Sequence, residues 1–120
     1  MEINIKNLEE IKVVELIGDV DASTVPKVQQ EILPLAQSNS KILLDMSQVP
    51  YMSSAGLRML LSLYRQTTAQ DGKLVLVGLS EDLQDTMSVT GFLDFFTTGD
   101  TLEAGLAELK ESVAWLLPNV

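Results

Sequence analysis

Residues 41–63 read KILLDMSQVPYMSSAGLRMLLSL, and this stretch decides the fold expected for the chain. Its first apolar run, residues 42–44, ends in Asp45 and is typical of a strand buried in a sheet. A polar break follows and ends in two serines, and apolar residues then recur at helical spacing from Leu57. The stretch therefore predicts a strand, a loop and a helix that begins at Ser54.

The beginning of this predicted helix favours negative charge. Backbone N–H groups there have no partner within the helix, and the helix dipole has its positive end at that point. A phosphate on the Ser54 hydroxyl could therefore be held without unfolding the chain, and a docking partner would still meet it. Composition alone favours Ser54 as the N-cap of the helix, a role worth about 1 kcal/mol for serine, and capping is compatible with a phosphoacceptor role at the same residue.

Strand and helix patterns alternate along the rest of the chain. Strands are expected near residues 2–6, at 11–17, up to residue 45, at 74–79 and at 95–97. Helices are expected at 23–35, 54–70, 81–90 and 102–113. Ser23 is the expected N-cap of the first helix, and Pro34 should kink that helix or end it early, because proline has no N–H to donate.

The order of these elements predicts one α/β domain over residues 1–120. The first two strands form a hairpin and therefore an antiparallel edge. The strands and helices that alternate after them require parallel strands joined by right-handed crossovers. The expected architecture is a mixed sheet of about five strands with about four helices.

The composition excludes several classes of function. The formal net charge of −9 repels nucleic acid and anionic lipid, so neither is an expected partner. The chain has no Cys and no His, which excludes thiolate metal sites, a Cys nucleophile and a Ser-His-Asp triad. No nucleophile is paired with a base, so we expect no enzyme, no metal and no cofactor.

The polar N-terminus and the short apolar runs of the sequence indicate where the protein is located. The first ten residues are too polar for a signal peptide, and no apolar run approaches the length of a membrane span, so a cytoplasmic location is expected.

Residues 115–118 (Trp, Leu, Leu and Pro) form an apolar tail, which either packs on the domain or frays.

Four pieces of sequence, together with the order of the elements, resemble the STAS domain family and, within it, the bacterial anti-sigma factor antagonists (anti-anti-sigma factors). They are GDVD at residues 18–21, LLDMS at 43–47, VPYMSS at 49–54 and AGLR at 55–58. The resemblance covers nearly the whole chain and implies the mixed α/β fold expected above.

The resemblance also implies a phosphorylation switch. In this family the unphosphorylated domain binds an anti-sigma factor that is also a serine kinase. Phosphorylation of a serine at the start of the second helix releases that partner, and a PP2C-type phosphatase restores the domain. On this alignment the phosphoacceptor falls on Ser54. Ser53 stands where the family usually has Asp, and it is the lesser candidate acceptor.

Charged residues near the serine pair are candidate partner contacts. Asp19 and Asp21 follow the second strand, and the resemblance places their loop beside the serine loop, although both could simply belong to a solvated turn. Arg58 comes one turn after Ser54 and is either a partner for the phosphate or, as we favour, a solvated helix charge.

Uncharged residues complete the expected contact surface. Gly56 either lets a partner's backbone approach or packs tightly against a neighbouring strand. Tyr51 and Met52 are expected to be half-buried anchors of the loop with a possible contact role. The expected partner-binding set is Asp19, Asp21, Tyr51, Met52, Ser53, Ala55, Gly56 and Arg58.

Two other kinds of function stay open at this point. A receiver domain has its phosphoacceptor Asp at the end of a central strand, where this chain has Asp45, but the acidic pair and the Lys that a receiver needs are missing. Otherwise Asp45 caps the following turn and contributes modestly to the electrostatics of the serine site. A small-ligand-sensing STAS module is the other alternative, although no glycine-rich phosphate loop supports it.

Overall fold

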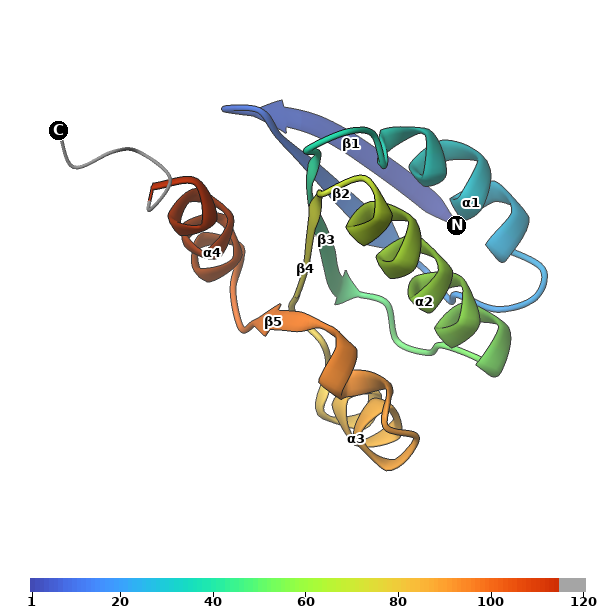
Figure 1. Cartoon of the computed structure of the whole chain (residues 1–120). Helices are drawn as coiled ribbons and strands as arrows, with labels where there is room; N and C mark the ends of the chain where they lie inside the picture. Colours follow the sequence, from blue (N-terminus) through green and yellow to red (C-terminus); the bar gives the residue numbers. More distant parts are fainter. Residues whose placement is uncertain (115–120) are drawn as a thin grey trace, which may run out of the picture.

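A five-stranded mixed sheet forms the centre of the computed structural model, which describes residues 1–114 (Figure 1). The strands lie in chain order, with the first pair antiparallel and every later pair parallel. Their bounds are β1 (Glu2–Leu8), β2 (Ile11–Ile17), β3 (Lys41–Gln48), β4 (Lys73–Val77) and β5 (Thr97–Gly99). The mixed α/β architecture predicted from the sequence is confirmed. The apolar tail at 115–118 lies outside the described residues.

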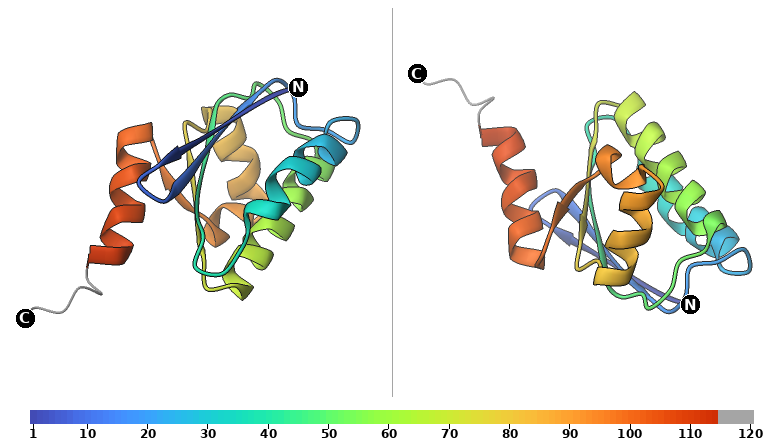
Figure 2. Two further views of the ribbon diagram at one scale, coloured as in Figure 1. Left: turned by 90° about the horizontal axis from the view of Figure 1, so that it is seen from above. Right: turned by 90° about the horizontal axis from the view of Figure 1, so that it is seen from below.

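Four α-helices cover the two faces of this sheet. They are α1 (Val25–Ile32), α2 (Ser54–Ala69), α3 (Glu81–Val89) and α4 (Leu102–Ala114). The first three pack on one face and α4 packs on the other, as the views from above and below show (Figure 2). Among these helices none has the length and apolar character needed to cross a membrane.

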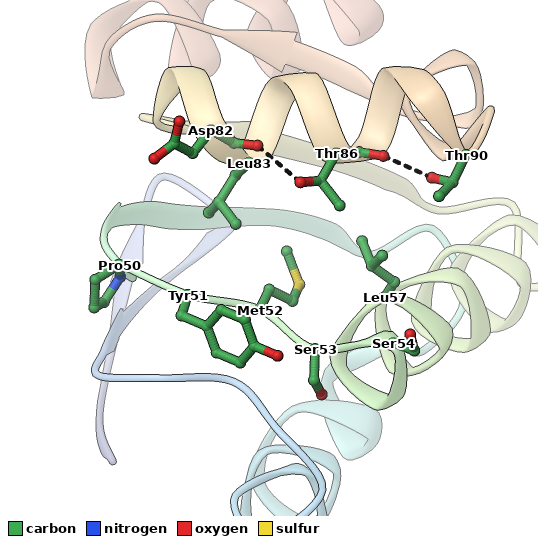
Figure 3. A pocket seen from close by; sticks show the side chains of 10 residues that line it. All are labelled: Pro50, Tyr51, Met52, Ser53, Ser54, Leu57, Asp82, Leu83, Thr86 and Thr90. Atoms are coloured by element: carbon green, nitrogen blue, oxygen red, sulfur yellow. Dashed lines mark hydrogen bonds between the residues drawn. The ribbon is translucent and has the colours of Figure 1, made fainter.

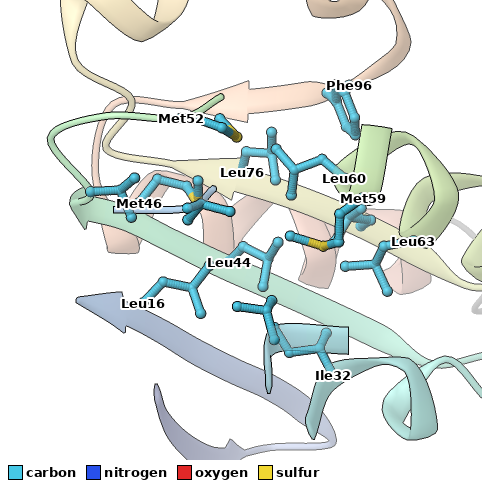
Figure 4. Packing of buried hydrophobic residues seen from close by; sticks show 14 of the residues in the cluster. Leu16, Ile32, Leu44, Met46, Met52, Met59, Leu60, Leu63, Leu76 and Phe96 are labelled. Carbon is cyan, nitrogen blue, oxygen red and sulfur yellow. The ribbon is translucent and has the colours of Figure 1, made fainter. Parts of the chain in front are cut away.

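Alternation along the buried strands gives each face its own apolar cluster. On β3, Ile42 and Leu44 point into the large cluster beneath α1, α2 and α3, whereas Leu43 points into the smaller cluster beneath α4. The large cluster is completed by residues of the helices and loops, including Leu60 and Met52 (Figure 4). Even-numbered residues at the start of β3 therefore face α1, α2 and α3, and odd-numbered ones face α4.

The first helix differs from its prediction at its start and agrees at its end. The N-cap is Thr24, so the expectation for Ser23 is wrong. The Asp21 carboxylate accepts hydrogen bonds from the backbone N–H groups of Ser23 and Thr24, and this turn delays the helix by one residue. At the other end, α1 stops at Ile32 and a 3₁₀ turn, Leu33–Leu35, takes in Pro34, which confirms the early ending.

The last strand also lies later than predicted. The segment Phe92–Phe95 forms a 3₁₀ turn, and β5 begins only at Thr97. Phe95 and Phe96 make edge-to-face contacts with Tyr64 of α2, with ring centroids 6.0 and 5.5 Å apart. The aromatic pair was read as strand because its residue types favour strands, but its packing against α2 decides the backbone.

Two loops are joined at the carboxyl ends of β2 and β3. The Val20 N–H donates to the Tyr51 carbonyl at 3.0 Å, and the Ser53 N–H donates to the Val20 carbonyl at 2.9 Å. Val20 and Met52 form a short parallel bridge between the same segments. The loop that carries Asp19 and Asp21 is therefore held beside the loop that carries the two serines, as the resemblance implied.

Gly56 closes this junction from the helix side. A Cβ atom on Gly56 would lie 2.6 Å from the Met52 Cγ and 2.7 Å from the Val20 carbonyl oxygen. Gly56 is buried, so its bare backbone serves close packing of α2 on the junction. Of the two explanations that the sequence left open for this glycine, the structure supports the internal contact.

We predict that Gly56→Ala destabilises the protein by about 1–3 kcal/mol, because the added methyl group overpacks the junction. This loss should appear although alanine favours a helix over glycine by about 1 kcal/mol. Gly99→Ala is the matched control, because a Cβ there would meet its nearest neighbours only at 3.4 Å. Urea unfolding of both variants checks the prediction, and equal stabilities would contradict it.

Candidate functional site

The start of α2 assigns different roles to the two serines. Ser53 is the N-cap, with extended backbone angles, and its hydroxyl accepts a hydrogen bond from the Gly56 N–H at 3.3 Å. Ser54 is the first residue of the helix. The idea that Ser54 combines capping with another role is therefore wrong, because Ser53 has the extended conformation that a capping side chain requires.

The Ser54 side chain is exposed, and the structure records no hydrogen bond to its hydroxyl within residues 1–114. The first turn of α2 contains no acidic residue, so no side-chain charge there offsets the positive end of the helix dipole. The free N–H groups and this dipole favour an anionic group at the helix start. Ser54 is thus open to solvent, at a helix start where the first turn carries no acidic side chain.

The loop beside the serines carries two acidic residues that differ in exposure and in hydrogen bonding. Asp19 is exposed, whereas Asp21 is half-buried and holds its own loop together. The Ser23 hydroxyl donates to the Asp21 carboxylate at 2.6 Å and holds the pKa of that carboxyl below its usual value, with the N–H groups of Ser23 and Thr24 acting in the same direction. Asp21 therefore shapes the loop, while the Asp19 side chain is open to a partner.

The serine loop itself has one exposed and one buried anchor. Tyr51 is 54% exposed, and Met52 is only 4% exposed and belongs to the large apolar cluster. The expectation that both are half-buried is therefore wrong, because Tyr51 is exposed and Met52 is buried. The bridge to Val20 turns Met52 towards the core. With Gly56 also buried, the surface at this point is formed by Tyr51, Ser53, Ser54 and the half-buried Ala55.

Arg58 lies on the exposed surface of α2, one turn after Ser54. The only ion pair in the described part of the chain joins Lys110 to Glu9, so Arg58 pairs with no carboxylate there. Residues separated by four positions are neighbours on a helix surface. The Arg58 guanidinium is therefore available to a phosphate on Ser54 or to a partner.

Sequence analysis did not predict that α3 would border the serine loop. An open groove of about 370 Å³ lies between them (Figure 3). Its α3 wall is formed by Asp82, Leu83, Thr86 and Thr90. The hydroxyls of both threonines donate to carbonyl oxygens of their own helix, at 3.0 and 2.9 Å. Their spacing of four residues on one helical face was the signal that sequence analysis missed.

The loop side of this groove carries the serines. It is lined by Pro50, Tyr51, Met52, Ser53, Ser54 and Leu57. Leu57 and Leu83 are nearly buried, at 5% and 4% exposure, so the floor is apolar and the rim is polar. This arrangement suits an apolar or uncharged side chain of a partner protein better than a hydrated ion.

Asp45 does not belong to this site. It shares the parity of Leu43 on β3 and lines a hollow on the opposite face with Glu15, Lys6 and Leu102. Its carboxylate accepts hydrogen bonds from the N–H and the hydroxyl of Ser47, which still lies within β3, so the expectation that Asp45 caps the following turn is wrong. The expected electrostatic contribution of Asp45 to the serine site is wrong, because the sheet lies between them. Residues 1–114 contain no acidic cluster of the kind that holds a metal ion.

Comparison with known proteins places the chain in a family. The model of the STAS domain matches residues 2–105. The anti-sigma-B factor antagonist of Bacillus subtilis is 26% identical over 106 residues, which cover 88% of this chain and 97% of the relative.

Two solved structures share the fold. A serine-to-glutamate variant of RsbS from Moorella thermoacetica has a TM-score of 0.81 at 21% identity, with 95% of this chain and 99% of the other covered. The phosphorylated form of the Bacillus protein SpoIIAA has a TM-score of 0.68 at 18% identity, with 89% and 98% covered. With the family model spanning most of its length, the chain belongs to the STAS domain family.

Proposed function

We propose that this protein is an anti-sigma factor antagonist, a regulatory binding module whose affinity for an anti-sigma factor is set by phosphorylation of Ser54. In the unphosphorylated form the serine loop and the groove beside α3 bind the partner. The partner is also a serine kinase: it transfers the γ-phosphoryl group of ATP to the Ser54 oxygen, which loses its proton as ADP leaves. A PP2C-type phosphatase hydrolyses the phosphoserine and resets the module.

The observation that carries this proposal is the exposed Ser54 at the start of α2, in a loop whose backbone is fixed by the bridge to Val20. The relative in Bacillus subtilis bears the name of an anti-sigma-B factor antagonist, and the neighbouring SpoIIAA structure is a phosphorylated form. Both support the same role for this chain. The partner-facing residues are Asp19, Tyr51, Ser53, Ala55 and Arg58, which are exposed or half-buried around Ser54.

The groove explains how one phosphate can abolish binding. A phosphoserine carries about −1.5 to −2 charges at neutral pH. If a partner covers the groove, this charge must lose water against Leu57 and Leu83. The effective penalty for burying an unpaired ion is several kcal/mol, and about 1.4 kcal/mol corresponds to a tenfold change in affinity. The bulk of the phosphate in the groove acts in the same direction.

The charges around the site indicate what the partner surface presents. Asp19 lies on the neighbouring loop and Asp82 lies on the far wall of the groove, and both are exposed. With a net charge of −9, the protein favours a basic partner and approaches it faster at low ionic strength. The anti-sigma factor should therefore have basic residues around a less polar centre.

The two serines should separate in a paired alanine experiment. Ser53→Ala removes the cap and should lower the stability by about 1 kcal/mol, whereas Ser54→Ala should change it by less than about 0.5 kcal/mol. Phosphate incorporation by the anti-sigma kinase should show the reverse pattern and disappear only in Ser54→Ala. Urea unfolding and phosphopeptide mass spectrometry measure the two effects. Phosphorylation retained in Ser54→Ala would rule out this acceptor.

Phosphorylation itself should weaken the complex by at least about a hundredfold, from the desolvation penalty described above. Calorimetry with enzymatically phosphorylated protein and the anti-sigma factor measures this directly. Ser54→Asp carries one charge and less bulk, so a smaller loss of about tenfold is expected. Treatment with the phosphatase is the control and should restore the original affinity. Equal affinity of the two forms would refute the switch.

The groove wall should matter for binding but not for folding. Thr86→Arg places a long charged side chain in the groove and should weaken partner binding by about tenfold or more. Ser88→Arg is the matched control, because Ser88 is exposed on the same helix and does not line the groove. Both variants should unfold at the same denaturant concentration. If Thr86→Arg bound as well as Ser88→Arg, α3 would have no part in the interface.

A further inference from the structure

The outer edge of β1 is an unpaired sheet edge that lies outside the proposed serine site. Within residues 1–114, β1 has β2 on one side and no strand on the other. Six of its seven residues are exposed, and Ile5 and Leu8 each keep 41% of their surface in contact with solvent. In the view from above, this strand lies in front of the other strands, and no helix or loop of the described residues crosses it (Figure 2). An open edge of this kind is a template for pairing with another strand.

We propose that β1 pairs with β1 of a second copy in an antiparallel arrangement centred on Asn4, which joins the two sheets into one of ten strands. In this register Glu2 faces Lys6 of the second copy, Ile3 faces Ile5, and Asn4 faces Asn4. A two-fold axis repeats every contact, as in an isologous dimer. The proposal is independent of the proposed function and concerns a different surface.

The hydrogen-bonding groups of β1 point in the directions that this register needs. The turn between β1 and β2 has two residues, Glu9 and Glu10, both with positive φ, and Leu8 pairs with Ile11 across it. Leu8 therefore exchanges hydrogen bonds with β2, and by alternation so do Lys6, Asn4 and Glu2. The N–H and C=O groups of Ile3, Ile5 and Asn7 point to the open edge. Pairing Ile3 with Ile5 of a second copy uses these outward groups.

The side chains match as well. Glu2 and Lys6 lie on the same face of β1, four residues apart, and neither makes an ion pair within residues 1–114. In the Asn4-centred register each meets its opposite charge directly across the new strand pair, where side chains are close. A lone Lys on an edge strand discourages pairing, but a Lys with a Glu at the symmetric position makes the edge complementary to itself.

The apolar side chains lie on the other face. Ile3 and Ile5 pair with Leu16 and Val14 of β2, which belong to the large cluster. Ile3 already packs against that cluster, whereas Ile5 is largely open. In the dimer Ile5 of each copy would cover Ile3 of the other, and the cluster would extend across the axis. One strand pair buries little area, so we expect a weak dimer with a Kd on the order of 10–100 µM.

Charge exchange between positions 2 and 6 tests the register. Sedimentation velocity over a concentration series should show dimerisation of the wild-type protein, weakened about tenfold in Glu2→Lys and in Lys6→Glu, because each places like charges face to face. The double exchange should restore the dimer, and an equimolar mixture of the two single variants should form a heterodimer. Lys73→Glu has the same charge change as Lys6→Glu and lies on β4, so it should associate like the wild type.

Amide exchange gives a second readout that does not depend on the variants. In the dimer the outward amides of Ile3 and Ile5 should exchange more slowly as concentration rises, while those of Asn4 and Lys6 should stay protected throughout. A wild-type protein that stays monomeric up to about ten times the upper Kd expected above would overturn the proposal. So would a dimer that is equally affected by Lys6→Glu and Lys73→Glu, or one that the double exchange does not restore.

Discussion

Two backbone hydrogen bonds through Val20 hold the functional end of this protein in place. Because the N–H and the carbonyl of one residue bond to Tyr51 and Ser53, the loop after β2 and the loop after β3 behave as one body. Because Gly56 has no Cβ, α2 can pack closely against the Val20 carbonyl oxygen at that junction. The interaction uses main-chain groups, but the close packing of Gly56 on Val20 and Met52 limits which side chains the junction can accept. Everything that a partner meets here depends on this junction: the exposed Asp19 and Tyr51, the position of Ser54 and the mouth of the groove.

The same junction explains why Ser53 is the N-cap and Ser54 is the first residue of the helix. The hydrogen bond from Ser53 to Val20 helps to hold Ser53 in an extended conformation, which makes it the cap and engages its hydroxyl with the Gly56 N–H. Ser54 is then the first helical residue and keeps its hydroxyl outside. The family resemblance puts Asp at the position of Ser53, and a carboxylate there could accept the same hydrogen bond from the Gly56 N–H. A serine cap leaves the helix start without a compensating negative charge, so a phosphate at Ser54 meets less repulsion from its neighbour than it would beside Asp.

The order of the elements could be predicted from the sequence because buried strands and amphipathic helices have different periods, and β2 was predicted at its observed bounds. The errors have local causes. Ser23 and Ser54 were expected as caps because serine favours that role, but the cap is decided by the backbone angles of single residues, which neighbouring hydrogen bonds set. Asp45 was placed near the serines because a strand was expected to end there. β3 instead continues to Gln48, and its parity directs the carboxylate to the α4 face. The groove on α3 joins residues about thirty positions apart: the spacing of Thr86 and Thr90 marks one helical face, but it does not reveal which loop that face borders.

A switch at Ser54 has to act through the surface rather than through the core. Leu60 of α2 and the strand residues beneath it, Leu44 and Leu76, are completely buried and closely packed, and such cores do not deform gradually. The phosphate would sit outside them, on a helix end that tolerates it, so it creates little difference between alternative folds of the module. A modification can shift a conformational equilibrium only by its differential interaction with the two states. Under the proposed function the states that differ are bound and free: the phosphate would be hydrated in the free protein and would have to lose water in the groove of the complex. The conformation of the module would therefore stay the same, and the change in affinity would arise at the interface between the two proteins.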